Sequence, residues 1–359
     1  MSKEKIDVLV VDDSRVARQL LVHLLESDPK IRVSGVVADG QAAVDFVQQH
    51  PPDVVLMDVH MPRLDGFSAT RHIMETHPVP IVICSALIDA KSVATSFRLI
   101  EAGAVACLEK PVSPGHPGFK PMADELLQTV KLMSEVKVVR RWPRSRTTPI
   151  RPAIPPEERF LDTGKKLVAI GASTGGPLVL QTILRGLPKD LAAPVLIVQH
   201  IAPGFLSGLA DWLTQTTCWP VQIAAHGHDP LPGHAYLAPD GMHLGVAPSG
   251  RIFLSQEELE NGVRPAVSYL FRSLAEIHGA NAVGVLLTGM GRDGSSELKQ
   301  MKDAGAETIA QDEATSIIYG MPGEAIRMGG ACQVLPADQI AQAVTALVGR
   351  ESPTGKTNS

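Results

Sequence analysis

The chain has 359 residues, of which 44% are hydrophobic and 20% are charged, and its formal net charge is −5. This length suggests two domains, and the composition is that of a globular protein rather than a disordered or fibrous one. The small negative charge argues against a protein that coats nucleic acid or an anionic membrane through a general positive field.

The cysteines and the apolar runs indicate where such a chain would reside. The four cysteines lie far apart without a CxxC pair, which excludes an obvious zinc site or disulfide framework. The apolar run at 8–11 is too short for a signal peptide, and no segment approaches the ~18 continuous apolar residues of a membrane span. We therefore expect a cytoplasmic protein without membrane insertion. The cysteines are Cys84, Cys107, Cys218 and Cys332.

Short apolar runs alternate with helix-period segments in the first part of the chain. This alternation is typical of βα units, so we expect an α/β domain over 1–133 with a doubly wound, five-stranded parallel sheet of the flavodoxin-like kind. The expected strands lie at 6–11, 31–37, 53–58, 80–86 and 106–111, and the expected helices at 18–25, 42–49, 67–74 and 93–103.

A basic, proline-rich segment follows and separates two α/β regions. Residues 136–156 contain six Lys and Arg residues and many prolines but no acids, which predicts a semi-extended linker over 134–164. A solvated connector and a docking strip for an acidic partner are both compatible with it. Nucleic-acid binding is not expected, because no recognition motif accompanies the charges.

The βα alternation resumes at 165–350, before a short polar tail at 351–359. We expect a second doubly wound parallel-sheet domain whose clearest strands lie within 165–173, 194–201, 282–290, 307–311 and 331–336. Between the second and third of these, 234–254 alternates in polarity and carries two turn signals, which predicts an antiparallel hairpin insertion.

Acidic and polar residues follow the predicted strands of the first domain. Asp12 and Asp13 end the first strand and Asp58 the third, while Ser85 and Lys110 follow the fourth and fifth. The carboxyl ends of parallel strands meet at one edge, so these side chains should converge there. Clustered carboxylates repel one another without a cation, which indicates Mg²⁺. Lys110 and Ser85 supply a positive charge and a hydroxyl donor.

This ordered set resembles the receiver domain of bacterial response regulators over roughly residues 5–130. The matching segments are VVDDS, LMDVHMPRLDG, CSA and LEKP. The resemblance implies that Asp58 accepts a phosphoryl group from a histidine kinase, with Asp12, Asp13 and the carbonyl of His60 around the metal. Cys107 departs from the family, which usually has an aromatic residue three positions before the lysine.

Ser173 lies in a glycine-rich turn between a predicted strand and a helix that begins near Gly176 and Pro177. Such a turn can present a nucleophile to free backbone N–H groups, but it can also cradle a phosphate. Two residues favour a hydrolase: His200 ends the next strand, and Asp293 follows a later one at the same sheet edge. A nucleophile, a base and an orienting carboxylate on one rim fit a catalytic triad.

Each triad residue also has a structural interpretation. Ser173 resembles a helix cap, Asp293 could cap a helix that begins near Ser295, and His200 could be a satisfied polar residue at a strand end. Other histidines compete with His200 as the base, although none ends a strongly apolar strand. These are His226, His228, His234 and His243.

Longer motifs resemble one family over both domains: the chemotaxis response regulator protein-glutamate methylesterase, CheB. They are GASTGGP, VQHI, the YLAP hairpin, LFRSLA, LLTGMGRDG and DEATSIIYGMPGEAI. The resemblance implies that the chain hydrolyses glutamate γ-methyl esters on the cytoplasmic helices of methyl-accepting chemoreceptors, and often deamidates glutamines there. It assigns Ser173 as nucleophile, His200 as base, Asp293 as its partner and the Met290 amide as an oxyanion donor. Ester hydrolysis would need no cofactor.

Two other functions compete with this interpretation. The second domain could be a non-catalytic regulator that binds a phosphorylated or nucleotide ligand at the GASTGG turn. A DNA-binding response regulator is disfavoured, because the second half shows βα alternation instead of a helix-turn-helix pattern.

Overall fold

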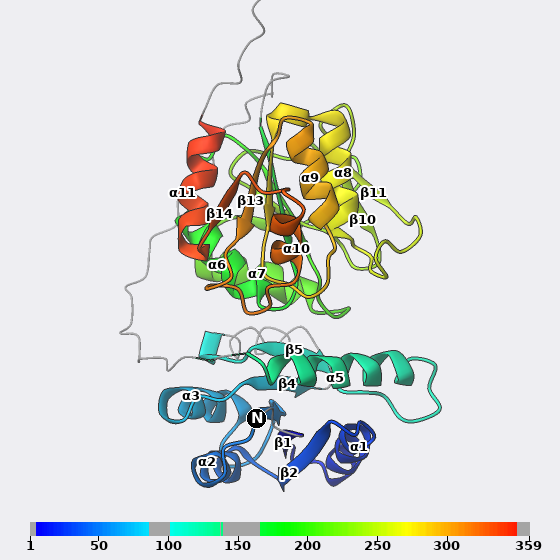
Figure 1. The fold of residues 1–359 in the computed structure, drawn as a ribbon, viewed down its shortest axis with the longest axis vertical. Helices are drawn as coiled ribbons and strands as arrows, with labels where there is room; N and C mark the ends of the chain where they lie inside the picture. The colour runs from blue at the N-terminus through cyan, green and yellow to red at the C-terminus, as the bar shows by residue number, and fades with distance from the viewer. Residues whose placement is uncertain (1–4, 86–100, 137, 139–165, 350–359) are drawn as a thin grey trace, which may run out of the picture. The chain divides into compact units, whose positions relative to one another are not determined.

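A computed structural model describes residues 5–85, 101–136, 138 and 166–349 of the protein. These residues divide into two compact units, one formed by the described residues up to 138 and one by residues 166–349. Most of the predicted linker at 134–164, most of the helix expected at 93–103 and the tail at 351–359 lie outside the described residues. Figure 1 shows the two sets of elements.

The first unit contains the expected five-stranded parallel sheet, in the order β2-β1-β3-β4-β5 of flavodoxin-like folds. The unit's strands are β1 (Ile6–Val11), β2 (Ile31–Val37), β3 (Val54–Met57), β4 (Ile81–Ser85) and β5 (Ala106–Glu109). The helices are α1 (Arg15–Glu26), α2 (Gly40–Gln49), α3 (Gly66–Thr76) and α5 (Phe119–Met133). α1 packs with α5, and α2 packs with α3 on the opposite face (Figure 1).

Local sequence explains where the first three helices of this unit begin. Ser14, Asp39 and Asp65 each precede a helix, and each side chain accepts a hydrogen bond from a backbone N–H of the first turn. These caps satisfy amides that have no partner within the helix. The strands end just before them, which places the helix starts and the polar strand ends at one edge of the sheet.

The second unit is built on a seven-stranded parallel sheet in the order β14-β13-β12-β6-β7-β9-β8. The five clearest predicted strands are present as β6 (Leu167–Ala172), β7 (Val195–Gln199), β12 (Ala282–Leu286), β13 (Glu307–Gln311) and β14 (Gln333–Leu335). Helices cover both faces of the sheet. One group is α6 (Gly176–Gly186), α7 (Leu206–Thr217) and α11 (Ala337–Val348), and the other is α8 (Val267–Ile277), α9 (Ser295–Asp303) and α10 (Met321–Arg327), with a 3₁₀ turn at Gly279–Asn281.

The antiparallel hairpin is confirmed, but it is shorter than the segment predicted. β10 (His243–Val246) and β11 (Ile252–Ser255) pair with each other as a separate two-stranded sheet beside α8. The start of the predicted segment instead forms β9 (Ala235–Leu237), which lies between β7 and the short β8 (Val221–Ile223) in the parallel sheet. All three β9 residues are buried, and so short a strand, covered on both faces, has no alternation to reveal it.

β6 occupies the centre of the second sheet, with β7 on one side and β12 on the other. The chain passes from β6 to β7 in one direction and returns later to place β12 on the opposite side. The strand order therefore reverses at β6, which is where open α/β sheets bind ligands beyond the strands' carboxyl ends. Among the described residues, no helix combines the length and apolar character needed to cross a bilayer.

Candidate active site

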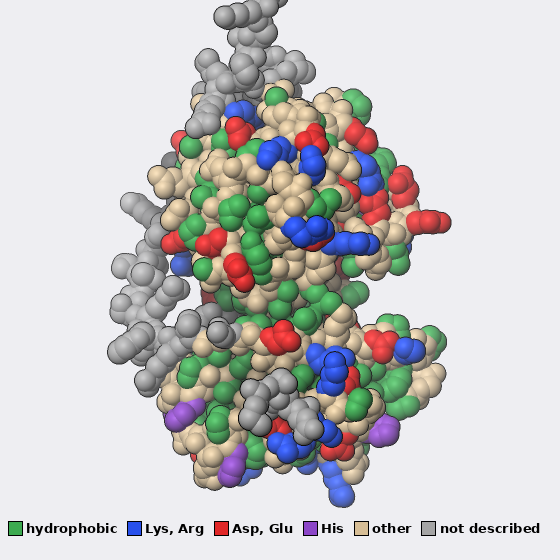
Figure 2. Space-filling view, viewed as in Figure 1, with side chains coloured by type: hydrophobic (Ala, Val, Ile, Leu, Met, Phe, Trp, Pro, Cys, Tyr) green, Lys and Arg blue, Asp and Glu red, His purple; other side chains and the backbone are tan. Residues whose placement is uncertain are grey.

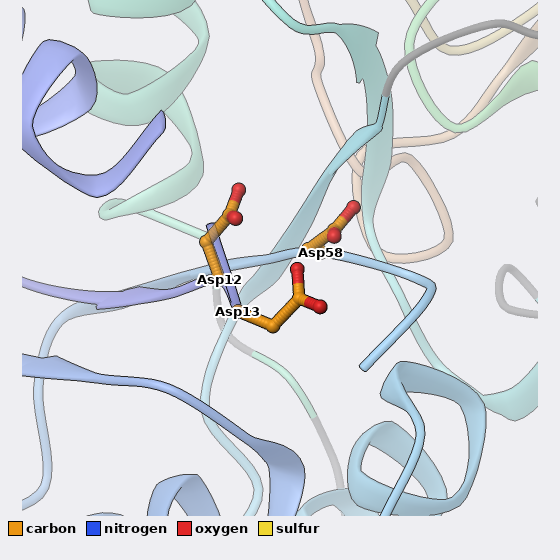
Figure 3. A group of neighbouring side chains, drawn as sticks. All are labelled: Asp12, Asp13 and Asp58. Carbon is orange, nitrogen blue, oxygen red and sulfur yellow. The ribbon is translucent and has the colours of Figure 1, made fainter. Parts of the chain in front are cut away.

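Three carboxylates gather at the carboxyl edge of the first sheet. Asp12 and Asp13 follow β1 and Asp58 follows β3, and one oxygen of each lies within 4.8 Å of the others. Figure 3 shows the three side chains extending in the same general direction from the strand ends. Asp12 and Asp58 are buried, whereas Asp13 is exposed. Closely spaced carboxylate oxygens, with one member open to solvent, fit a hard divalent cation such as Mg²⁺.

Lys110 partly neutralises this cluster. Its Nζ lies 2.7 Å from Oδ2 of Asp12 and 3.1 Å from Oδ1 of Asp58. Burial, together with the charge of Asp12, raises the pKa of Asp58 despite the opposing effect of Lys110. The one lysine therefore does not fully offset the cost of burying these charges, and a cation would offset the remainder.

The other residues expected around this site take different positions. Ser85 is buried at the end of β4, and its carbonyl accepts the backbone N–H of Lys110 at 3.0 Å. His60 is exposed, two residues after Asp58. Cys107 lies within β5 and pairs in register with Ile83 of β4.

In the second unit, Ser173 occupies the turn between β6 and α6. Its backbone N–H donates to the carbonyl of Thr288 at 3.0 Å, and its own carbonyl accepts the N–H of Gly176 at 2.8 Å. Gly289 passes so close that a Cβ there would lie 2.7 Å from the Ser173 Cβ, which explains why the β12 loop has glycine at this position. The backbone that carries the hydroxyl is therefore held from both sides.

His200 and Asp293 meet at the same sheet edge. His200 directly follows β7, and its Nε2 lies 2.9 Å from Oδ2 of Asp293 in the loop after β12. The His200 side chain is 16% exposed and that of Asp293 is 5% exposed. The Ser173 hydroxyl makes no hydrogen bond to any residue that the structure describes, so the structure joins two of the three predicted residues directly.

Asp293 accepts four hydrogen bonds, two on each oxygen. Oδ2 accepts from His200 and from the backbone N–H of Val267 at 2.6 Å. Oδ1 accepts from the N–H of Ser268 at 3.1 Å and from Nδ2 of Asn261 at 3.0 Å. Val267 and Ser268 form the first turn of α8, so Asp293 caps that helix. The alternative prediction, a cap on α9, is wrong: Gly294 precedes α9, which has no side-chain cap.

These contacts determine the charge of Asp293. Burial on its own would raise the pKa of this carboxyl. The hydrogen bond from His200, the charge of His200 and the donors at the start of α8 outweigh burial, so the pKa lies below its usual value. The carboxylate is therefore ionised at neutral pH. Because an ionised carboxylate only accepts hydrogen bonds, Nε2 of His200 must carry the proton, which leaves Nδ1 as the basic nitrogen.

Two backbone amides near Ser173 are free to bind an anion. Neither Thr174, in the nucleophile turn, nor Met290, in the β12 loop, donates its N–H to any residue in the described ranges. The side chain of Thr288 connects these segments, because its Oγ1 contacts the Thr174 carbonyl at 3.0 Å and accepts the N–H of Ile318 at 2.9 Å. Amides without a partner, close in the chain to a candidate nucleophile and its loop, are the kind of donor that forms an oxyanion hole.

Three of the four competing histidines, His226, His234 and His243, have ring partners outside the candidate triad. His243 is fully buried beside Tyr269, where its ring bridges the N–H of Ala266 and the carbonyl of Glu258. His226 accepts the N–H of Leu254 in β11. The rings of His228 and His234 form no hydrogen bond with Ser173 or Asp293.

Two residues that contact the site were not anticipated. Gln199 is buried at the end of β7, and its Nε2 donates to the carbonyls of both Ser173 and His200 at 2.8 Å. A glutamine within an otherwise apolar strand could have been noticed, since a buried amide needs partners. Asn261 forms an Asn-Gly pair, which usually signals only a turn, and nothing in the sequence connects it to Asp293.

One known protein family matches each of the two units. The family model for the response regulator receiver domain matches residues 8–116, and that for the CheB methylesterase matches residues 168–344. A crystal structure of the Thermotoga maritima CheB methylesterase catalytic domain matches with a TM-score of 0.50 and 41% identity, covering 51% of this chain and 98% of that one.

Two relatives match this chain over nearly the full length of both proteins. The protein-glutamate methylesterase/protein-glutamine glutaminase 4 of Geobacter metallireducens is 53% identical over 95% of this chain and 99% of its own length. A protein with the same activities in its name, from Syntrophus aciditrophicus, is 52% identical over 97% of this chain and all of its own. The protein is thus a response regulator whose second domain is an enzyme. It belongs to the CheB family of protein-glutamate methylesterase/protein-glutamine glutaminases.

The face drawn in Figure 2 has no broad positive patch of the kind that binds nucleic acid or an anionic membrane. Figure 2 shows Lys and Arg side chains interspersed with Asp and Glu on the drawn face of each unit. In the second unit, opposite charges pair on two helices, Arg327 with Glu324 at 2.6 Å and Lys299 with Asp303 at 2.7 Å. Mixed signs cancel at a distance, so this face produces no broad positive field.

Proposed function

We propose that the second domain hydrolyses glutamate γ-methyl esters on the cytoplasmic helices of chemoreceptors and deamidates glutamines there, and that phosphorylation of Asp58 in the first domain activates it. The observation that carries the proposal is the His200–Asp293 pair at the sheet edge where Ser173 follows β6. The names of the full-length relatives supply the two reactions and the protein substrate. We expect the protein to act in the cytoplasm, beside the receptor helices.

In this mechanism His200 acts as base and acid in turn. Nδ1 takes the proton of Ser173 as Oγ attacks the ester carbonyl, and Asp293 stabilises the resulting imidazolium. The tetrahedral intermediate then breaks its C–O bond to the methoxy group, which leaves as methanol with the proton from His200. Water attacks the glutamyl-enzyme in the same way, which releases a glutamate side chain and restores Ser173. All proton transfers use His200, so the steps require no metal.

The amides of Thr174 and Met290 would stabilise the oxyanion. Their N–H groups have no partner among the described residues, so they can bind developing charge without breaking an existing contact. Loss of one such donor typically costs about 10²–10³-fold in rate. For a glutamine substrate the same steps release ammonia in place of methanol.

Control would begin at Asp58. A histidine kinase of the chemotaxis type would donate the phosphoryl group, with Mg²⁺ held by Asp12, Asp13, Asp58 and the carbonyl of His60. The cation would neutralise both the carboxylates and the phosphoryl oxygens. Lys110 lies 3.1 Å from Asp58 and is placed to pair with the new charge, and the Ser85 hydroxyl would donate to it. We expect residues 1–133 to act as this receiver, residues 134–164 as a linker and residues 165–350 as the enzyme.

The catalytic assignment is tested by measuring methanol release from methyl-labelled receptor membranes. The Ser173→Ala variant should release no more methanol than a blank, whereas Ser316→Ala, a matched change at a serine outside the triad, should retain activity. Release by Ser173→Ala at the wild-type rate would remove Ser173 as the nucleophile and favour a ligand-binding role for its turn.

The regulatory assignment is tested by the response to a small phosphodonor in the same assay. The Asp58→Ala variant should keep its basal rate and lose the increase that the donor and Mg²⁺ produce in the wild type. Asp53→Ala, at an aspartate before β3 instead of after it, should still respond. An equal increase in Asp58→Ala would show that another residue is the control point.

A further inference from the structure

A tight turn lies beside the hydrolase site at Asn261 and Gly262. The flanking residues Glu260 and Val263 exchange both backbone hydrogen bonds, at 3.2 and 2.9 Å. The two central residues have φ angles of 53° and 81°, the left-handed values of a type I′ turn. Asn and Gly tolerate this conformation better than other residues, so turn geometry alone restricts the choice at 261 to a few residue types.

The asparagine side chain reaches beyond the turn. Its Nδ2 donates to Oδ1 of Asp293 and to Oγ of Ser268, each at 3.0 Å. Both hydrogens of the amide are thereby used, and both acceptors belong to the environment of the catalytic pair. Asn261 itself is exposed, while Asp293 and Ser268 are buried, so the contact does not arise from core packing.

This contact completes the set of donors that determines how the Asp293 carboxylate is rotated. Two of its four donors, the N–H groups of Val267 and Ser268, belong to the backbone of α8. The third is His200, whose position Asp293 is expected to control. Asn261 is the remaining donor and holds the oxygen that does not touch His200. Without it, Oδ1 would keep a single partner and the carboxylate could tilt away from the imidazole.

The charges around the turn require a neutral donor at this position. Ser268 donates its hydroxyl to Glu297 at 2.7 Å, and Glu260 pairs with Arg272 of α8. Asp293 therefore has other carboxylates nearby, and His200 is the group expected to become positive during the reaction. An acid in place of Asn261 would add a negative charge in direct contact with Asp293.

We infer that Asn261 is a positioning residue of the hydrolase site, whose side-chain amide holds Asp293 in the orientation that keeps His200 ready to accept the Ser173 proton. The inference rests on the proposed roles of those three residues. Asn261 acts through Asp293 and does not touch the substrate.

Two substitutions separate this role from that of a turn residue. Asn261→Gly and Asn261→Asp both suit a left-handed turn position, but the first deletes the amide and the second replaces a donor with an acceptor. The full chain, activated with the same phosphodonor, is assayed for methanol release, with unfolding measured in parallel. For Asn261→Gly we expect kcat to fall roughly 10- to 100-fold, the worth of one hydrogen bond to a charged group, with KM unchanged.

The pH profile of Asn261→Asp provides the decisive readout. Two carboxylates in contact share a proton as the pH falls, and a protonated Asp at 261 can again donate to Oδ1 of Asp293. The ratio of variant to wild-type kcat should therefore rise as the pH is lowered from 8 toward 6. A kcat of wild-type size in Asn261→Gly, or a ratio for Asn261→Asp that is constant with pH, would overturn the inference.

The same assay distinguishes failure of this inference from failure of the proposed function. If Ser173→Ala is inactive and the Asn261 variants behave like the wild type, only the positioning role is refuted. If Ser173→Ala and Asp293→Ala are both as active as the wild type, the proposed triad is refuted and the positioning role with it.

Discussion

Replacement of Asp293 by asparagine changes one oxygen to an NH₂ group and leaves the side-chain volume nearly unaltered. The two oxygens are matched in their surroundings, since each accepts one backbone N–H of α8 and one side-chain donor. Whichever way the new amide turns, its NH₂ group faces two donors. One backbone N–H in the first turn of α8 then has no acceptor.

This geometry sets the expected loss in stability and the expected loss in kcat. A buried donor without a partner costs about 1–3 kcal/mol, which is the expected loss in the free energy of unfolding. If the NH₂ group faces His200, Nε2 must become the acceptor and the proton moves to Nδ1, the nitrogen that should receive the Ser173 proton. The analogous change in a serine-protease triad lowers kcat about 10⁴-fold, which corresponds to ~5.4 kcal/mol.

The unfolding of Asp293→Asn should also depend less on pH. The pKa of Asp293 is lower in the folded protein than its ordinary value of 3.8, so its ionised form stabilises the fold. That contribution is complete above pH 3.8 and is lost as the pH falls through the lower folded pKa. The variant lacks this group, so its stability relative to the wild type should improve over that acidic range.

Three measurements test this reasoning together. Urea unfolding gives the stability loss at neutral pH and at acidic pH, methanol release gives kcat, and the ¹⁵N shifts of the His200 ring report which nitrogen is protonated. A kcat within tenfold of the wild type, with Nε2 of His200 still protonated, would show that Asp293 does not control the base.

Two further predictions concern the first domain. Lys110→Ala leaves Asp12 and Asp58 without the cation that lies within 3.1 Å of both, so phosphorylation by a small donor should slow at least tenfold, while the more negative cluster should bind Mg²⁺ more tightly; an unchanged Mg²⁺ dependence would contradict this. Gly66→Ala would place a Cβ 2.1 Å from the carbonyl oxygen of Asp58, so we expect the free energy of unfolding to fall by about 1–3 kcal/mol, measured from the unfolding transition of the receiver domain in denaturant. A stability equal to the wild type would show that the β3–α3 turn adjusts freely.

The sequence predicts the sheets well because burial and periodicity reflect the fold directly. The strands that directly precede Asp58, Ser173 and His200 consist almost entirely of buried apolar residues, and the parallel topology then places the polar residues that follow them at one edge of a sheet. β9 was misplaced because a three-residue strand has too few positions to show a period.

Contacts between distant segments were harder to predict. The structural alternative for Asp293 was a cap on the helix that follows it, whereas its side chain caps α8, which begins 26 residues earlier in the chain. Asn261 lies 32 residues before Asp293, and its role as a turn residue already explains its identity. In both cases the sequence shows only the local setting of the side chain, and the remote partner is visible only in the fold.

The distribution of the hydrolase site along the chain has a consequence for biosynthesis. A ribosome completes Asp293 long after Ser173, and the Thr288 hydroxyl still awaits the amide of Ile318 at that point. Domains made early generally fold while the rest of the chain is being translated. The receiver therefore has time to form before an active esterase can exist, so the proposed phosphorylation control would already be in place in each new molecule before its first turnover.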